Sequence, residues 1–248
     1  MEEAINEAEK LDIPNKDREL EVMFQAGIQF GYSRSRRHPS MSDFIHGVKN
    51  NIEIFDLEKT KEALEEAENF LRKIGEAKRN VLWVGTKPSA KALIEKYAKT
   101  LSHSYAAGRW IGGTLTNAKI IRDRIKYFED LKKKSESKEL EKYTKKEKLK
   151  IAREIKTLEE KFSGIENLKN DVGAMIIVDP KEEKTAFSEA RRVSLPVIAI
   201  LSSDNDLSKV AYPIPGNDSA SSSLEYLLGK LAKAYQEGVS KSNLNSNV

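Results

Sequence analysis

The sequence predicts an α/β fold with helices on both faces of a parallel sheet, on three observations. Two continuous apolar segments, Val81–Val84 and Ala174–Val178, have the composition of strands buried on both sides. Segments with helical periodicity follow such strands repeatedly, and this alternation favours a parallel sheet. A longer helical stretch over 118–163 interrupts the alternation. We therefore expect an inserted antiparallel helical hairpin within the α/β domain.

The composition limits the functions that the chain can have. Its 248 residues include no cysteine, which excludes disulfides, thiolate metal sites and a cysteine nucleophile. No apolar run approaches the roughly 20 residues that span a bilayer. The N-terminus is acidic and lacks an apolar signal core. We therefore expect a cytoplasmic protein with no membrane partner.

The charge is unevenly distributed along the chain. Residues 1–21 hold eight acidic and three basic side chains, a net of −5. Because the whole chain carries +4, residues 22–248 carry +9. This distribution favours a polyanionic partner for the body of the protein. We expect residues 1–17 to form an acidic extension outside the core.

The sharpest cluster of basic and aromatic residues in the chain lies in a loop. After a helix over 18–26, the glycines and proline of residues 27–41 predict an irregular segment. Arg34, Arg36 and Arg37 stand in it between serines, flanked by Tyr32 and His38. Guanidinium groups suit phosphate oxygens and the rings could stack on exposed bases. We favour RNA or another polyanion over the alternative of a solvated, mobile loop.

A strand–turn–helix unit follows a strand over 52–55 and a helix from about 56 to 74. The strand Val81–Val84 leads into Gly85-Thr86-Lys87, and a helix begins near Pro88. The unit lacks the second glycine and the spacing of a nucleotide phosphate loop. Lys87 could still contact an external phosphate, because the carboxyl edge of a parallel sheet is where such folds bind ligands.

The stretch Arg109–Asn117 is the point around which the chain is organised. A short strand over 103–107 precedes it, and the pair Gly112-Gly113 permits backbone angles barred to other residues. Arg109 suits phosphate, Trp110 offers a face for stacking, and Thr116 or Asn117 suits the N-cap of the next helix. A nucleic-acid surface and a tight turn with a half-buried tryptophan remain open as interpretations.

The hairpin and the second half complete the predicted order. Apolar residues recur at helical steps over 118–128 and 151–162, joined by a lysine-rich connector. Strands then follow over 174–178, 196–201 and 212–214, with helices over 183–193 and 219–238. The α/β domain thus comprises 18–117 and 164–238, the hairpin comprises 118–163, and residues 239–248 are expected to be disordered.

The sequence contains no catalytic or cofactor-binding motif. There is no nucleophile elbow, dinucleotide fingerprint or metal-ligand spacing. Asp179 and Asp204 stand at strand ends, but each is more simply a helix cap or turn residue, and His38 and His46 have few nearby carboxylates. We therefore expect neither an enzyme nor a bound cofactor or metal.

The motifs in order resemble the ribosomal protein S2 family of the small subunit, in its bacterial or organellar form. Arg109–Asn117 matches the family's R-W-x-G-G-x-L-T-N. Further matches are 27–31, 38–41, 56–60, 84–87, 195–199 and 214–218, so the resemblance covers residues 20–238. Gln29 and Tyr32 stand where the family commonly has histidines, and residues 202–205 depart from its usual turn.

The resemblance implies a flavodoxin-like doubly wound parallel sheet with an inserted coiled-coil hairpin. It also implies a structural role in translation: binding small-subunit ribosomal RNA beside neighbouring ribosomal proteins, including the large S1 protein. On this reading the backbone-contacting residues are Arg34, Arg36, Arg37, Lys49, Lys87, Arg109 and Asn117, and Gly112, Gly113 and Thr116 also belong to the rRNA-binding surface. Tyr32, His38 and Trp110 would pack or stack.

Two other classes of function remain open from the sequence. One is an α/β enzyme or binding protein for a phosphorylated small molecule, using Gly85-Thr86-Lys87 and the strand-end aspartates. The other is a protein–protein adaptor with the hairpin as its arm.

Overall fold

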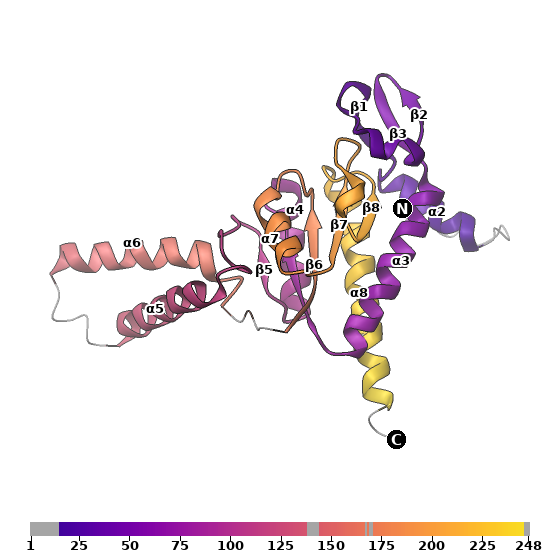
Figure 1. Cartoon of the computed structure of the whole chain (residues 1–248). Helices are drawn as coiled ribbons and strands as arrows, with labels where there is room; N and C mark the ends of the chain where they lie inside the picture. Colours follow the sequence, from indigo (N-terminus) through magenta and orange to yellow (C-terminus); the bar gives the residue numbers. More distant parts are fainter. Residues whose placement is uncertain (1–14, 138–143, 167, 169–170, 246–248) are drawn as a thin grey trace, which may run out of the picture.

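The protein is built on a five-stranded parallel sheet with the strand order β5-β4-β6-β7-β8 (Figure 1). The computed structural model describes residues 15–137, 144–166, 168 and 171–245. The strands are β4 (Asn80–Val84), β5 (Tyr105–Ala106), β6 (Val172–Val178), β7 (Val197–Leu201) and β8 (Tyr212–Pro215). Numbered along the chain, their order is 2-1-3-4-5, that of flavodoxin-like doubly wound sheets. The α/β prediction is confirmed.

Helices cover both faces of this sheet. One face packs against α3 (Leu57–Glu76), α4 (Pro88–Thr100) and α8 (Ser221–Asn245), around a core that contains Trp83, Ile176 and Ile198. The other face carries α7 (Lys184–Arg192) and the start of α5 (Ala118–Glu136), around Leu82 and Met175. Alternate residues of each strand thus point to opposite cores, as the continuous apolar runs predicted.

A second, antiparallel sheet lies beside the main one, with the order β1-β3-β2 (Figure 1). Its strands are β1 (Phe30–Ser33), β2 (Ile45–Lys49) and β3 (Ile52–Phe55), and α2 (Asn15–Gln25) precedes it. β3 is the strand expected over 52–55, but it lies outside the parallel sheet. β1 and β2 were not expected, because they are short and largely exposed and so lack an apolar run.

Among the described helices, α3 and α8 pack against each other most extensively, and they lie side by side in Figure 1. Glycines make this approach close: a Cβ atom at Gly75 would overlap the Tyr235 carbonyl, and one at Gly238 would overlap the Arg72 carbonyl. Helix α8 continues to Asn245, so the expectation of disorder was wrong for 239–245. The reason is packing of Val239 on the core and an ion pair between Lys241 and Glu76 of 2.8 Å.

Two helices leave the sheet between β5 and β6: α5 and α6 (Lys145–Phe162), which project from the body in Figure 1. The connector over 138–143 lies outside the described residues. Ile121, Ile125 and Phe128 of α5 are buried, as is Phe162 of α6. The chain returns to the sheet where the Tyr105 N–H donates to the Gly164 carbonyl at 2.7 Å. A coiled-coil geometry for this pair stays a prediction.

The N-terminal boundary also differs from the expected one. Helix α2 begins at Asn15, three residues inside the acidic extension expected over 1–17, and residues 1–14 lie outside the described part of the chain. Among the helices that the structure describes, none combines the length and apolar character that a membrane crossing requires.

Candidate nucleic-acid interface

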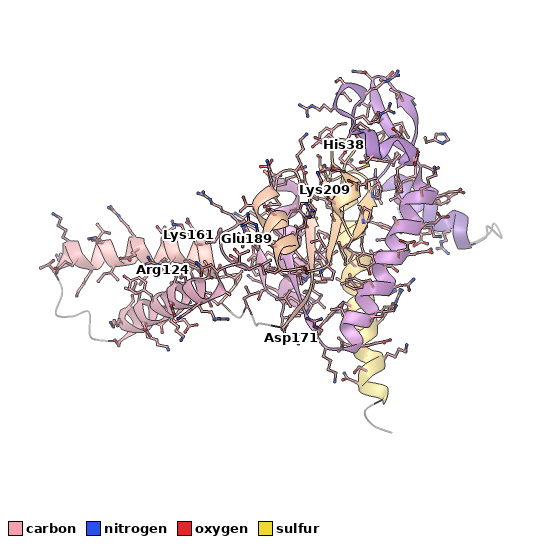
Figure 2. All side chains as sticks on the ribbon, in the orientation of Figure 1. His38, Arg124, Lys161, Asp171, Glu189 and Lys209 are labelled. Carbon is pink, nitrogen blue, oxygen red and sulfur yellow. The ribbon has the colours of Figure 1, made fainter. Side chains whose placement is uncertain are left out.

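The loop Arg109–Asn117 folds around a carboxylate of the protein itself. Glu189, on the inner side of α7, accepts from the Trp110 indole N–H at 3.1 Å and from the Gly113 N–H at 2.7 Å (Figure 2). Its second oxygen accepts from the Leu115 N–H at 3.1 Å, and from both the N–H and the hydroxyl of Thr116 at 3.3 and 3.2 Å. Successive backbone N–H groups of this kind form an anion-binding nest. Here the anion belongs to the chain.

The electrostatics of this nest favour the ionised form of Glu189. The side chain is only 6% exposed, and burial alone would raise its pKa. The hydrogen bonds from Gly113, Trp110, Leu115 and Thr116 outweigh burial and lower the pKa below its usual value. The nest is therefore occupied by a stable carboxylate at neutral pH.

The nest changes the roles expected for three residues of the loop, Trp110, Gly113 and Thr116. Trp110 is 8% exposed and its N–H is committed to Glu189, so it offers no free face for stacking. The Gly113 N–H and both donors of Thr116 are likewise committed, and Gly113 takes a φ of +93° that favours glycine. Gly112 is exposed, with open space where a Cβ would stand.

Two residues of the same loop do point outward. Arg109 and Asn117 are exposed, and within the described residues the Arg109 side chain has no ion-pair partner. Asn117 occupies the N-cap position of α5, as expected, but its side chain makes no capping hydrogen bond. Both remain available to an external partner.

The basic loop after β1 presents its arginines to solvent. Arg34 and Arg36 are exposed on a single 3-10 turn, and the Arg36 guanidinium lies 5.5 Å from the Tyr32 ring centroid. The Tyr32 hydroxyl lies 3.0 Å from the Ser219 hydroxyl, and its N–H donates to the Ser203 hydroxyl. The loop is thus anchored at Tyr32 and open at the arginines.

Arg37 differs from the two arginines before it. Its Nε lies 3.4 Å from Glu53 Oε1, and Glu53 is fully buried with no hydrogen bond to either carboxylate oxygen within the described residues. Arg37 therefore compensates a buried charge of β3. Lys49, at the end of β2, is exposed and has no ion-pair partner in the described part of the chain.

His38 is held in one tautomer by Ser40. Because the Ser40 N–H donates to His38 Nδ1 at 3.3 Å, this nitrogen is an acceptor. The Ser40 hydroxyl, which accepts from the Leu207 N–H at 3.1 Å, therefore donates its own proton to His38 Nδ1 at 2.8 Å. The proton of the neutral ring therefore lies on Nε2, which is left to donate to an external acceptor.

Lys87 is committed inside the protein. Its Nζ lies 2.5 Å from Asp179 Oδ2 and 3.1 Å from Asp218 Oδ2, at the carboxyl end of β4 where the strand order reverses. Burial would lower the pKa of Lys87, but Asp218 and Asp179 outweigh it and raise the pKa above its usual value. Asp179 also accepts from the N–H groups of Lys181 and Glu182, so it is a turn residue, which was one of its two expected roles, and the N-cap of α7 is Glu183. The expected phosphate contact by Lys87 does not fit this arrangement.

A group of cations on α7 was missed by the sequence analysis. Together with His38 of the basic loop and Lys209 after β7, both labelled in Figure 2, it surrounds a hollow of about 670 Å³. The basic side chains that line the hollow are His38, Lys181, Lys184, Arg191, Arg192 and Lys209. The spacing of Lys184, Ser188 and Arg191 along one helical face could have revealed it. Among the described residues no cluster of three or more potential metal ligands is present.

Fold and surface together define a class of protein, a doubly wound α/β scaffold with a basic surface. The position where its strand order reverses is occupied by the ion pairs of Lys87 with Asp179 and Asp218. Cations without such partners in the described residues lie on the surrounding loops and on α7. A family model described as Ribosomal protein S2 matches residues 23–238, most of the chain. The chain therefore belongs to the ribosomal protein S2 family, a family of structural proteins of the small ribosomal subunit rather than of enzymes.

Proposed function

We propose that the protein binds small-subunit ribosomal RNA as a structural constituent of the subunit. The observation that carries the proposal is the outward basic loop: Arg34 and Arg36 are exposed and without carboxylate partners in the described residues. Arg109, Lys49 and Asn117 add outward polar groups on neighbouring loops. Such contacts recognise the RNA backbone and its shape more than its sequence.

Salt dependence tests this proposal directly. Because Arg37 compensates Glu53, the informative variant is Arg34→Gln with Arg36→Gln, which leaves the buried charge paired. Its affinity for a small-subunit rRNA transcript should fall, and the slope of log K against log salt should become shallower by roughly 0.7–0.9 per lost phosphate contact.

The matched control removes two charges elsewhere. Lys73 of α3 and Lys91 of α4 are exposed on helices that cover the far face of the sheet. Lys73→Gln with Lys91→Gln should change affinity by less than twofold. Equal losses in the two double variants would mean that net charge, and not the basic loop, governs binding.

The alternative of a phosphorylated small-molecule ligand loses its main support. It relied on Lys87 as a free cation at the strand-switch position, but the ammonium lies between two carboxylates. An added phosphate would meet Asp179 and Asp218 as well as Lys87, so repulsion opposes attraction there.

We extend the proposal to the projecting helices, which would form a coiled-coil arm. This arm would contact neighbouring ribosomal proteins, among them the S1 protein that the family resemblance implies. Buried residues of α5 recur at steps of four and three, and Tyr127 of α5 donates to Glu154 of α6 at 2.9 Å. Replacing residues 119–162 by a short glycine-rich turn should leave rRNA affinity nearly unchanged but reduce retention on sedimented small subunits. Unchanged retention would remove the arm's proposed role.

A further inference from the structure

Helix α7 has two functional faces. Ala186, Glu189 and Ala190 are buried, and Glu189 holds the Arg109–Asn117 loop. On the opposite side stand Lys184, Phe187, Ser188, Arg191 and Arg192, spaced as neighbours on one helical surface. The helix that anchors the family's most characteristic loop therefore also presents a cationic face outward.

The hollow beside this face is lined by more cations than its own carboxylates can neutralise, so positive charge remains for a ligand. Five Lys and Arg side chains line it against two carboxylates, a net of +3. Lys181 pairs with Asp204 at 2.7 Å and Lys209 with Asp206 at 2.8 Å. Within the described residues the remaining cations, on Lys184, Arg191 and Arg192, make no ion pair.

The opposite wall adds a directed donor. His38, labelled in Figure 2 with Lys209, lines the hollow, and its tautomer leaves the Nε2 proton without a partner in the described part of the chain. The hollow thus combines a group of cations, one imidazole N–H donor and the partly buried ring of Phe187.

We propose that this hollow receives a single unpaired nucleotide of the bound RNA. Lys184, Arg191 and Arg192 would hold its flanking phosphates, and its base would lie beside Phe187 and His38. The inference rests on the proposed function and adds a subsite to it. Proteins recognise RNA at unpaired nucleotides by this combination of charge and stacking.

Size and arrangement favour a nucleotide over a bare phosphate. A hollow of about 670 Å³ lies in the range of sites for small organic molecules. Phe187 stands one helical turn from both Lys184 and Arg191, so an aromatic surface lies between the cations. A duplex backbone would contact only the rim and leave the ring unused.

The test uses the full chain and three probes: hexauridylate, a blunt RNA duplex and inorganic phosphate. Phe187→Leu keeps apolar packing but removes the stacking surface. The triple variant Lys184→Gln, Arg191→Gln, Arg192→Gln removes the cations. Its matched control, Lys73→Gln, Lys91→Gln, Lys233→Gln, removes three charges from α3, α4 and α8 on the far face. Thermal unfolding checks that all variants fold.

Phe187→Leu should weaken hexauridylate binding about tenfold and change duplex binding by less than twofold. The triple variant should lower the salt slope for hexauridylate by about 2, at roughly 0.7 per contact, whereas the control triple should not. Millimolar phosphate should fail to displace hexauridylate. Ultraviolet cross-linking of bromouridine RNA should label the peptide that contains Phe187.

Other outcomes overturn the proposal in distinguishable ways. Unchanged hexauridylate affinity in Phe187→Leu, or displacement by phosphate alone, would reduce the hollow to a general anion site. If the variants bound hexauridylate as wild type does while Arg34→Gln with Arg36→Gln still lost rRNA binding, the subsite would fall and the proposed function would stand. If wild type bound neither RNA, both would fall.

Discussion

Two loops of this protein carry similar residues and are used in opposite ways. The loop 33–38 and the loop 109–117 both combine arginine, hydroxyl groups and an adjacent aromatic ring. In the first, Arg34 and Arg36 point to solvent. In the second, Trp110, Gly113 and Thr116 turn inward on Glu189. The difference teaches that similar composition does not decide whether the donors of a loop are committed within the chain or left exposed.

The internal anion gives the second loop a mechanical role. Glu189 ties the turn immediately before α5 to α7 through the hydrogen bonds that it accepts from Leu115 and Thr116. The first loop has no comparable centre, because its ties to the body run through Tyr32, Arg37 and His38.

The largest expected effect comes from removing that centre. Glu189→Ala should lower the free energy of unfolding by about 3 kcal/mol, because the buried Trp110 indole N–H and the partly buried donors of Gly113, Leu115 and Thr116 lose their acceptor. Urea unfolding followed by tryptophan fluorescence measures this. Glu182→Ala, which removes an exposed carboxylate just before α7, is the control and should cost less than about 0.5 kcal/mol. A loss below 1 kcal/mol for Glu189→Ala would show that the nest is not a stabilising centre.

Lys87→Met extends the comparison to the strand-switch position and should cost about 3 kcal/mol, because Asp179 and Asp218 are left without their cation. Burial already raises the pKa of Asp218, so one carboxyl group can take up a proton. The deficit relative to wild type should therefore shrink as the pH falls toward 4. A deficit that is independent of pH would contradict this account.

Substitutions at the two adjacent glycines measure the cost of backbone strain in the loop without removing the Glu189 carboxylate. Gly113→Ala should cost about 1–2 kcal/mol, because its φ is +93°. Gly112→Ala should change the stability by less than about 0.5 kcal/mol, since a methyl group there enters open space. Equal costs at both positions would mean that the loop does not hold the inward conformation.

The dependence of the free energy of unfolding on acidic pH should show a smaller contribution from Glu189. Because the pKa of Glu189 is depressed in the folded protein, its contribution is present above the unfolded value of 4.5 and is lost as the pH falls through the folded value. The difference in stability between wild type and Glu189→Gln should be constant above that range and narrow below it. Chemical denaturation at several pH values measures this, and parallel curves at all pH values would contradict it.

The smallest expected change concerns the outward loop. Arg34→Gln with Arg36→Gln should alter the free energy of unfolding by less than about 0.5 kcal/mol, because both side chains are exposed and unpaired in the described residues. Denaturation in the absence of RNA measures it. A loss as large as that of Glu189→Ala would remove the contrast between the loops.

Local sequence pattern was sufficient to predict most of the fold, but it predicted few of the contacts within the candidate site. The runs Val81–Val84 and Ala174–Val178 predicted buried strands because their continuous apolar composition is visible within the runs themselves. Glu189 lies 76 residues after Gly113, and Asp218 lies far along the chain from Lys87, so no local pattern could show that these donors were already committed. β1 and β2 escaped prediction because half-exposed strands carry little apolar signal.

The close approach of α3 and α8 has a consequence for how the protein is made. The first of these helices ends at Glu76 and the second begins at Ser221, so one wall of a core is synthesised long before the other. Contacts between these helices require closure of the stretch from 76 to 221, which is more than half of the chain. The part of the α3 surface that α8 covers therefore becomes buried only late in the translation of this polypeptide.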